Sequence, residues 1–266
     1  MVTRNQISDQ ERLQYQSDGH IHLTQVLDKS SLTAFKPALR AVMDELEPDR
    51  PPLEERDTYG RAFTQIINLW EESDLVKAFV FNESLASLAA QIMGVKSVRL
   101  YHDQALFKEV GGGPTPWHVD QVYWPLDTNN TCTFWIPLQD TSLKMGSLGF
   151  ATGSHRWKDG RDLLISDESE SFFSTWVREQ GFPVSQEAFE LGDISVHSGW
   201  TVHFAGGNQS QEPREVMTII YMDADTRVLR NPTPTQIVDR ETFIPGVEPG
   251  GLANTPLNPI LYPGKP

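Results

Sequence analysis

From Ser97 onward the chain is a succession of short segments rich in β-branched and aromatic residues, and this pattern limits the possible folds most strongly. The segments read SVRLYHDQALFKEV, TCTFWIPLQ, SLGFATG, GDISVHSGWTVHFA and EVMTIIYMDA, and they are separated by Gly, Pro, Asn and Asp. Such residues favour strands, and the separators favour turns. Five or more short strands in succession predict a β-sandwich or a closed β-barrel.

The first third of the chain has a different, helical pattern. Ser8 and Glu11 have the spacing of a capping box, which predicts a short helix that ends at Asp18-Gly19. HIHLTQVL then reads as an extended segment. A longer helix is predicted to begin at Asp28–Ser31, because apolar residues follow at helical spacing: Leu32, Phe35, Leu39, Val42, Met43 and Leu46.

Three more segments before Ser97 show apolar residues at helical intervals: 63–70, 75–81 and 85–93. A Pro-rich, charged surface loop is expected at 47–56. The prediction is therefore a mainly β fold with helical support (α+β), in which a helical layer carries a β-barrel.

The length suits a single domain that spans 1–266. Within it we expect mainly helical support over 1–95 and the β core over 96–230. The charged, aromatic insertion at 156–189 reads as a loop or helical lid. The Pro- and Gly-rich end, 231–266, is expected to be irregular.

The composition limits the kinds of molecule that the protein is expected to bind. With 36 acidic against 22 basic residues the net charge is -14, which disfavours binding to nucleic acid or to an anionic membrane surface. Cys132 is the one cysteine and cannot form an internal disulfide. The polar start and the lack of an apolar stretch of about 18 residues predict a cytoplasmic protein without a membrane span. A small-molecule substrate remains open, as does the oligomeric state.

His118-Val119-Asp120 is the first motif that suggests chemistry. On an extended segment, side chains two positions apart point to the same face, so an imidazole and a carboxylate can bind one metal ion. A match this short also arises by chance, and the alternative is a polar strand end.

A third ligand strengthens the metal interpretation. The candidates are His197 and His203, both in GDISVHSGWTVHFAGGN, and we favour His203. Two His and one Asp on one face of an octahedron are typical of non-haem Fe(II) oxygenases and leave positions for a cosubstrate and O2. Arg214 begins the strand after His203. A bidentate arginine suits the far carboxylate of a dicarboxylate that chelates iron through its 2-oxo acid end.

Several blocks together resemble a known family. YHDQALFKE, GPTPWHVDQVYWP, FWIPLQD, GSLGFATGSHR and HSGWTVHFAGGNQSQEPREV look like successive blocks of the phytanoyl-CoA dioxygenase-like (PhyH) family of Fe(II)/2-oxoglutarate-dependent oxygenases. They follow the family order over roughly 99–222. The resemblance implies a double-stranded β-helix, a cupin-like jelly roll, with N-terminal helices packed on one sheet.

The resemblance also implies a reaction. His118, Asp120 and His203 match the family's iron triad, and the expected cofactors are Fe(II), 2-oxoglutarate and O2. The implied activity is that of a dioxygenase that oxidises a small organic substrate, with hydroxylation as the expected outcome, and releases succinate and CO2. Because related halogenases replace the carboxylate by a small residue, Asp120 implies hydroxylation, desaturation or cyclisation instead of halogenation.

Other matched positions concern the cosubstrate. Arg214 matches the family's arginine for the 2-oxoglutarate carboxylate, and Gln104 and Trp135 fall where its other cosubstrate contacts lie. Ala205 departs from the family, since some members carry a serine hydroxyl there. Lys108 either borders the site or is solvated.

Two rival functions remain. A cupin-like Zn or Mn hydrolase or isomerase would use the same triad without needing Arg214, and a non-catalytic small-molecule-binding jelly roll would keep only the fold. His197 has two possible roles, a packed structural histidine or a hydrogen-bond donor beside the site, and we favour the first. Trp117, Tyr123 and Trp124 either line a substrate pocket or pack the sheet.

Overall fold

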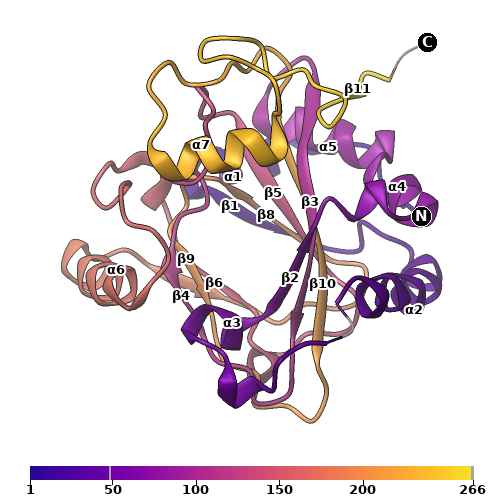
Figure 1. Cartoon of the computed structure of the whole chain (residues 1–266), viewed down its shortest axis with the longest axis vertical. Coiled ribbons are helices and arrows are strands. Elements are labelled where there is room, and N and C mark those ends of the chain that lie inside the picture. The colour runs from indigo at the N-terminus through magenta and orange to yellow at the C-terminus, as the bar shows by residue number, and fades with distance from the viewer. Residues whose placement is uncertain (48, 265–266) are drawn as a thin grey trace.

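Antiparallel pairing joins every neighbouring pair of named strands in the computed structural model, which describes residues 1–47 and 49–264 (Figure 1). In the larger sheet the order is β1-β8-β5-β10-β3-β11, and β2 pairs with a second stretch of β3. Its strands are β1 His20–Leu23, β2 Thr64–Ile67, β3 Val98–Lys108, β5 Thr131–Pro137, β8 Ile194–Ser198, β10 Arg214–Asp223 and β11 Ile260–Tyr262.

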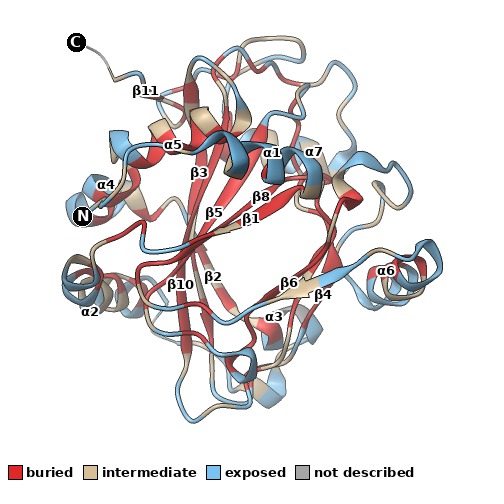
Figure 2. Ribbon diagram, turned by 180° about the vertical axis from the view of Figure 1, so that it is seen from behind, coloured by how far each residue is buried: buried red, intermediate tan, exposed pale blue. Residues whose placement is uncertain are grey.

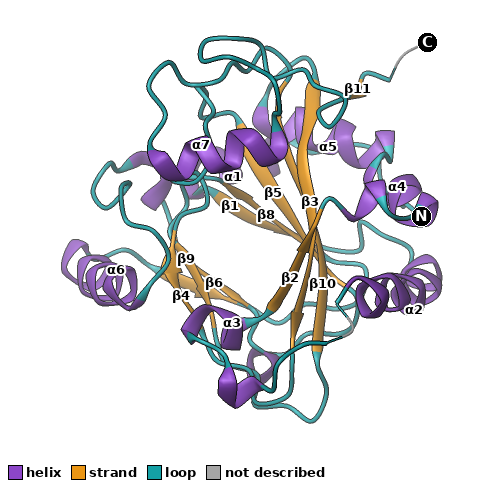
Figure 3. Cartoon of the chain, viewed as in Figure 1, coloured by secondary structure: helices purple, strands orange, loops and turns teal. Residues whose placement is uncertain are grey.

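The smaller sheet faces the larger one and has the order β4-β9-β6-β7 (Figure 3). Its strands are β4 Thr115–His118, β6 Leu148–Ala151, β7 Val184–Gln186 and β9 His203–Ala205. Two curled antiparallel sheets with helices outside one of them confirm the predicted mainly β fold with helical support.

Alternating side chains give the larger sheet two different faces. On β10, Met217, Ile219 and Tyr221 belong to the apolar core, whereas Arg214 and Thr218 line an internal cavity. Successive residues of a strand point to opposite faces, so one face packs against helices while the other faces the smaller sheet. The same strands therefore hold the core and expose polar groups to the cavity.

Helices cover the outer face of the larger sheet. α2 buries four apolar residues at helical spacing, as predicted, and Asp28 caps its first turn by accepting from the Ser31 amide. The buried residues in Figure 2 lie along the strands and on the sheet-facing sides of α2, α4 and α5. The N-terminal helices are α1 Asp9–Asp18, α2 Lys29–Leu46, α3 Thr58–Ala62, α4 Asp74–Val80 and α5 Glu83–Met93. Short 3-10 turns occur along the chain at Leu53–Glu55, Leu69–Glu71, Leu143–Met145 and Ser154–Arg156.

The predicted capping box of α1 is confirmed, since the Ser8 side chain and the Glu11 carboxylate each accept the other's backbone amide. The helix ends at Gly19, whose φ of 78° is left-handed. No helix among the described residues combines the length and the apolar character that crossing a bilayer requires.

The helix predicted over 63–70 is wrong. Thr64–Ile67 is strand β2, which pairs with β3 in the register Thr64↔Phe107 to Ile67↔Gln104. The stretch is rich in β-branched residues, and β3 has an edge that offers backbone partners. Pairing across the sheet therefore outweighs an apolar spacing that also fits a helix.

The irregular end predicted over 231–266 is also wrong in part. Pro234–Phe243 forms helix α7, and β11 lies near the end of the chain. Thr233 caps α7 by accepting from the Gln236 amide, and the Gln236 side chain accepts from the Thr233 amide. This capping box, with Pro at the first helical turn, was a sequence signal for a helix.

The insertion at 156–189 contains helix α6, Asp167–Gln180. It packs beside β4, where Glu170 Oε2 accepts from the Trp117 amide at 2.8 Å. Among the described residues that line the cavity, Ile165 is the one from this insertion. The insertion therefore contains a helix that packs beside the smaller sheet, and its role as a lid stays a prediction.

Phe134 tests the packing between the larger sheet and its helices. It is buried on β5 and meets Tyr221 edge-on, with ring centroids 5.1 Å apart. Phe134→Ala should lower the free energy of unfolding by about 3–5 kcal/mol, because it leaves a cavity in the core. Urea unfolding followed by circular dichroism measures this. Leu13→Ala on α1, where the side chain is 63% exposed, is the control and should change it by less than about 0.5 kcal/mol. Equal losses would contradict the packing described.

Candidate metal centre and cosubstrate site

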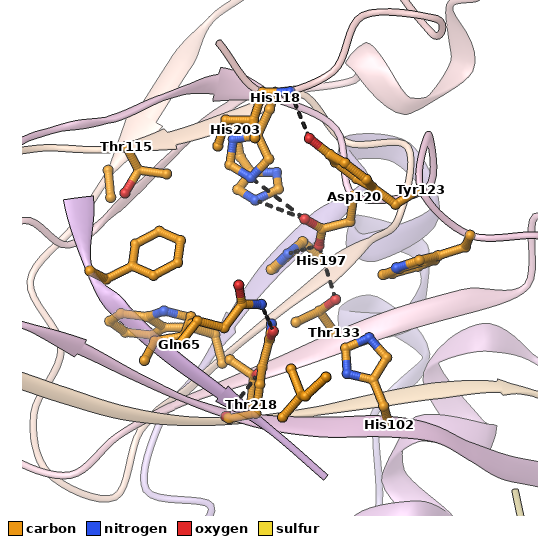
Figure 4. A pocket seen from close by; sticks show the side chains of 18 of the residues that line it. Gln65, His102, Thr115, His118, Asp120, Tyr123, Thr133, His197, His203 and Thr218 are labelled. Atoms are coloured by element: carbon orange, nitrogen blue, oxygen red, sulfur yellow. Dashed lines mark hydrogen bonds and ion pairs between the residues drawn. The ribbon is translucent and has the colours of Figure 1, made fainter. Parts of the chain in front are cut away.

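The smaller sheet brings the three predicted metal ligands together at the cavity (Figure 4). β4 ends at His118 and β9 begins at His203, and these two residues are partners in the antiparallel register. Asp120 lies two residues beyond β4, in the turn that follows. One ligand atom from each residue lies within 4.8 Å of the others. Asp120 Oδ1 is 3.6 Å from the Nε2 atom of each histidine.

Backbone carbonyls orient both imidazoles. His118 Nδ1 donates to the carbonyl of Pro116 at 2.7 Å, and His203 Nδ1 donates to that of Thr201 at 2.9 Å. A carbonyl oxygen only accepts, so the proton of each neutral ring lies on Nδ1 and the lone pair on Nε2. Metal-binding histidines commonly have this arrangement. Both Nε2 atoms therefore face the carboxylate with a free lone pair.

The two oxygens of Asp120 have different roles. Oδ2 accepts from His197 Nε2 and from Thr133 Oγ1, each at 3.2 Å. Oδ1 is left for a cation. Of the two roles open for His197, the structure supports the donor beside the site and not the favoured packing role, because its buried ring bonds directly to the carboxylate of Asp120.

The charges around the triad suit a divalent cation. Burial opposes ionisation of Asp120, but His203, His118 and His197 together hold the pKa of its carboxyl well below the ordinary value. Burial and the neighbouring His118 lower the pKa of His203. The carboxylate is therefore charged and His203 is neutral, which are the protonation states that metal binding needs.

A cavity of about 510 Å³ extends from the triad between the two sheets. This volume is in the range of small-molecule sites. The predicted cosubstrate residues Gln104, Trp135 and Arg214 all line it, as does Ala205. The Oε1 atom of Gln104 accepts from Gln65 Nε2. The indole nitrogen of Trp135 is buried without a hydrogen-bond partner.

Arg214 lines this cavity and has a second basic side chain, Lys108, beside it. Arg214 and Lys108 are register partners on β10 and β3, and both side chains are buried. Arg214 Nη1 donates to the carbonyl of Gly146, and Lys108 Nζ donates to that of Gly113. Neither has an ion-pair partner within the described part of the chain. Burial, with Arg214 alongside, lowers the pKa of Lys108 to about 6. A pKa of about 6 leaves the Lys108 amine mostly neutral at pH 7, so the Arg214 guanidinium is the buried cation here. Without a counter-ion it suits the carboxylate of an anionic ligand.

Sequence reasoning left other cavity residues open or missed them. Tyr123 and Trp124 line the cavity, whereas Trp117 packs against Phe204, with ring centroids 4.2 Å apart. His102 and Asp239 also line the cavity and were not predicted. The signal for His102 was its parity, because it lies two positions before Gln104 on the same face of β3.

A jelly roll with two His and one Asp beside a buried arginine without a counter-ion is the arrangement of a non-haem metal enzyme that binds an anionic cosubstrate. A sequence model of the phytanoyl-CoA dioxygenase (PhyH) family matches residues 15–216, and the chain belongs to this family. It is 28% identical over 156 residues to a probable alpha-ketoglutarate-dependent hypophosphite dioxygenase of Stutzerimonas stutzeri, covering 57% of this chain and 54% of that protein. It is 25% identical over 161 residues to a phytanoyl-CoA dioxygenase of Arabidopsis thaliana, covering 59% and 56%. The matched part thus spans just over half of each curated relative.

Solved structures match nearly the whole chain. The non-haem α-ketoglutarate-dependent carbocyclase SnoK from nogalamycin biosynthesis has a TM-score of 0.78 and 23% identity, with 96% of each chain covered. The epimerase SnoN, in complex with Fe3+, α-ketoglutarate and nogalamycin RO, has a TM-score of 0.75 and 25% identity, with 94% of this chain and 96% of that chain covered. EctD from S. alaskensis, with 2-oxoglutarate and 5-hydroxyectoine, has a TM-score of 0.70 and 17% identity, with 97% and 91% covered. The jelly-roll fold is confirmed, and the family resemblance with it.

His203 and His197 are expected to have different roles at Asp120, the first as a metal ligand and the second as a supporting hydrogen-bond donor. We expect His203→Ala to abolish tight Mn(II) binding, because it removes a ligand atom. His197→Ala should weaken binding by about 10- to 100-fold, because it removes only a hydrogen bond to the carboxylate. Anaerobic titration calorimetry with Mn(II) measures both, and circular dichroism checks the fold. Loss of metal in the His197 variant alone would reverse the assignment.

Proposed function

We propose that this chain is an Fe(II)- and 2-oxoglutarate-dependent dioxygenase that hydroxylates a small organic substrate. One observation carries the proposal: a His118–Asp120–His203 triad and an anion site without a counter-ion open into the same cavity. The chemistry requires both parts in one place, because the cosubstrate must contact the metal with one end and a cation with the other. Membership of the PhyH family supports it.

The triad would hold iron through the two Nε2 atoms and Asp120 Oδ1. Three protein ligands on one face leave the remaining coordination positions for cosubstrate and O2. With both bound, iron supplies the oxidant for a substrate C–H bond, and 2-oxoglutarate leaves as succinate and CO2. His197 and Thr133 fix the other carboxylate oxygen, so Asp120 is held in one orientation.

The anion site would take the distal carboxylate of 2-oxoglutarate. Arg214 offers a planar guanidinium for two-point contact, and its Nε is buried without a partner. The indole nitrogen of Trp135 is a second buried donor in need of an acceptor. Thr115, the register partner of Ala205, lines the cavity with its hydroxyl 3.4 Å from Lys108 Nζ. It would replace the serine hydroxyl that some family members carry at the position of Ala205.

Neither rival function accounts for the anion site. A Zn or Mn hydrolase or isomerase needs the triad alone, and a buried arginine without a counter-ion in its cavity would only destabilise the fold. A binding jelly roll needs no metal, yet both histidines are held with their lone pairs toward one carboxylate oxygen. The dioxygenase proposal uses all of these features.

Hydroxylation is the finer part of the proposal. Asp120 fills the carboxylate position, which supports oxygen chemistry over halogenation. Structural neighbours include an epimerase and a carbocyclase, so hydrogen abstraction from the substrate can lead to other products in this fold. The mass of the product separates these outcomes, because only hydroxylation adds one oxygen atom, and labelled O2 identifies its source.

Turnover of the cosubstrate tests the proposal. Protein loaded with Fe(II) should convert 2-oxoglutarate to succinate and CO2 with consumption of O2, and Asp120→Ala should lose this activity because it removes a metal ligand. Succinate is quantified by mass spectrometry. Asp225→Ala, which removes an exposed carboxylate in the turn after β10, should retain full activity. Full activity in Asp120→Ala, or none in the wild-type protein, would contradict the proposal.

Arg214 tests the cosubstrate site separately from the metal site. Arg214→Ala should weaken 2-oxoglutarate binding by about 30- to 4,000-fold, as expected when about 2 to 5 kcal/mol is lost with one partner of a buried charge pair. Arg214→Lys should recover part of this, since an ammonium group lacks the planar two-point contact. Titration calorimetry on anaerobic Mn(II)-loaded protein gives the comparison, and Mn(II) affinity should stay unchanged. Wild-type 2-oxoglutarate affinity in Arg214→Ala would remove the anion-site argument.

A further inference from the structure

The cavity has a second end, formed by α7 and by the turn that follows the metal motif. Asp239, Thr242 and Phe243 line it from α7, and Tyr123 and Trp124 line it from the turn. In Figure 1, α7 runs across one end of the two sheets, and Figure 4 shows Tyr123 beside Asp120. This end is free for a substrate, because the proposed cosubstrate site uses Arg214 at the other end.

Asp239 is a carboxylate without a counter-charge. Its Oδ2 accepts from the Tyr101 hydroxyl at 3.2 Å, which fixes the side chain on the cavity wall. Among the described residues it has no ion pair and no other side-chain hydrogen bond. Burial raises the pKa of its carboxyl to about 7, as expected for an acid that lacks a neighbouring cation. A cation brought by a ligand would supply the missing partner.

The walls around Asp239 are aromatic. Trp124 meets Tyr101 edge-on at 5.5 Å between ring centroids, and Phe243 stacks on His102 at 4.1 Å. Burial lowers the pKa of His102 to about 4, so this ring is neutral at physiological pH. Aromatic faces next to a carboxylate favour amines and quaternary ammonium groups through cation–π contacts.

The charges that line the cavity also favour a cationic ligand at this end. Arg214 is the one Lys or Arg among the described lining residues, and it lies at the opposite end from α7. A net charge of -14 adds a long-range field that attracts cations. An anionic substrate would meet an unpaired carboxylate here and find no cation.

We infer that Asp239 and the aromatic rings around it form a subsite for a positively charged nitrogen of the substrate, an amine or a quaternary ammonium. Tyr123 lines the same cavity as Asp120 and Asp239, and burial, together with the charges of these two carboxylates, raises the pKa of its hydroxyl. A small substrate held by its cation at Asp239 therefore extends past Tyr123 toward the metal centre. The inference rests on the proposed function for the reaction that follows, whereas recognition of the cation requires no turnover.

Three probes of similar shape test the subsite: choline, the neutral 3,3-dimethyl-1-butanol and the anionic 3,3-dimethylbutyrate. Binding is measured by titration calorimetry on metal-free protein and on anaerobic protein loaded with Mn(II) and 2-oxoglutarate. Choline should bind at least about tenfold more tightly than the alcohol, a difference of about 1.4 kcal/mol. On the loaded protein, in which 2-oxoglutarate occupies the site at Arg214, the butyrate should bind most weakly.

Asp239→Asn should reduce the preference for choline to within about threefold, or about 0.7 kcal/mol, because it removes the charge and keeps the shape. Thr242→Lys, at an exposed position one turn along α7, should also weaken choline binding by placing a cation beside Asp239. Glu241→Gln is the matched control. It removes a charge from the same helix, 3.9 Å from Arg240 and outside the cavity, and should leave the preference unchanged.

Failure of choline to bind the wild-type protein, equal binding of the alcohol, or an unchanged preference in Asp239→Asn would overturn the inference. Selective choline binding without any binding of 2-oxoglutarate would count against the proposed function and support the subsite. The two proposals therefore fail in distinguishable ways.

Discussion

The side-chain alternation of β3, β5 and β10 is the constraint on which the rest of the structure depends. Residues of one parity, such as Ala105, Phe134 and Ile219, pack under the N-terminal helices, and residues of the other parity, such as Gln104 and Trp135, face the smaller sheet. A shift of one residue would bury the polar row in the core and bring the apolar row into the cavity. The apolar core therefore fixes the register, and the register fixes which polar groups meet inside.

Charged groups of different sign lie one after another along the resulting cavity. The buried guanidinium of Arg214 lies at one end, the carboxylate of Asp120 with its histidines lies between, and Asp239 lies at the end covered by α7. Burying any of these groups without a partner costs free energy. In the free protein these groups lack partners, and bound ligands can supply them. A dicarboxylate, a divalent metal and a cationic substrate together would complete the set. This links the stability of the protein to its ligands.

Local patterns predicted much of the fold and the metal site, because strands and closely spaced ligands are each determined by a few neighbouring residues. His118 and Asp120 are two positions apart, and the family blocks placed His203 and Arg214. What failed depended on contacts between distant segments. Thr64–Ile67 became a strand because β3 offers it an edge. His197 is close to Asp120 because β8 pairs with β5, and the spacing of residues in the sequence does not predict that pairing. The fit of α7 over the cavity, and with it Asp239, likewise needed the assembled sheets.

The central claim is that one cavity holds a metal by the triad and a dicarboxylate by Arg214. The most direct measurement is a crystal structure with Mn(II) and 2-oxoglutarate, with the metal located by anomalous scattering. The claim predicts one metal peak within about 2.3 Å of His118 Nε2, His203 Nε2 and Asp120 Oδ1, a distance typical of such ligands. It also predicts the distal carboxylate of 2-oxoglutarate on the Arg214 guanidinium. A metal bound through His197, or 2-oxoglutarate bound away from Arg214, would contradict it.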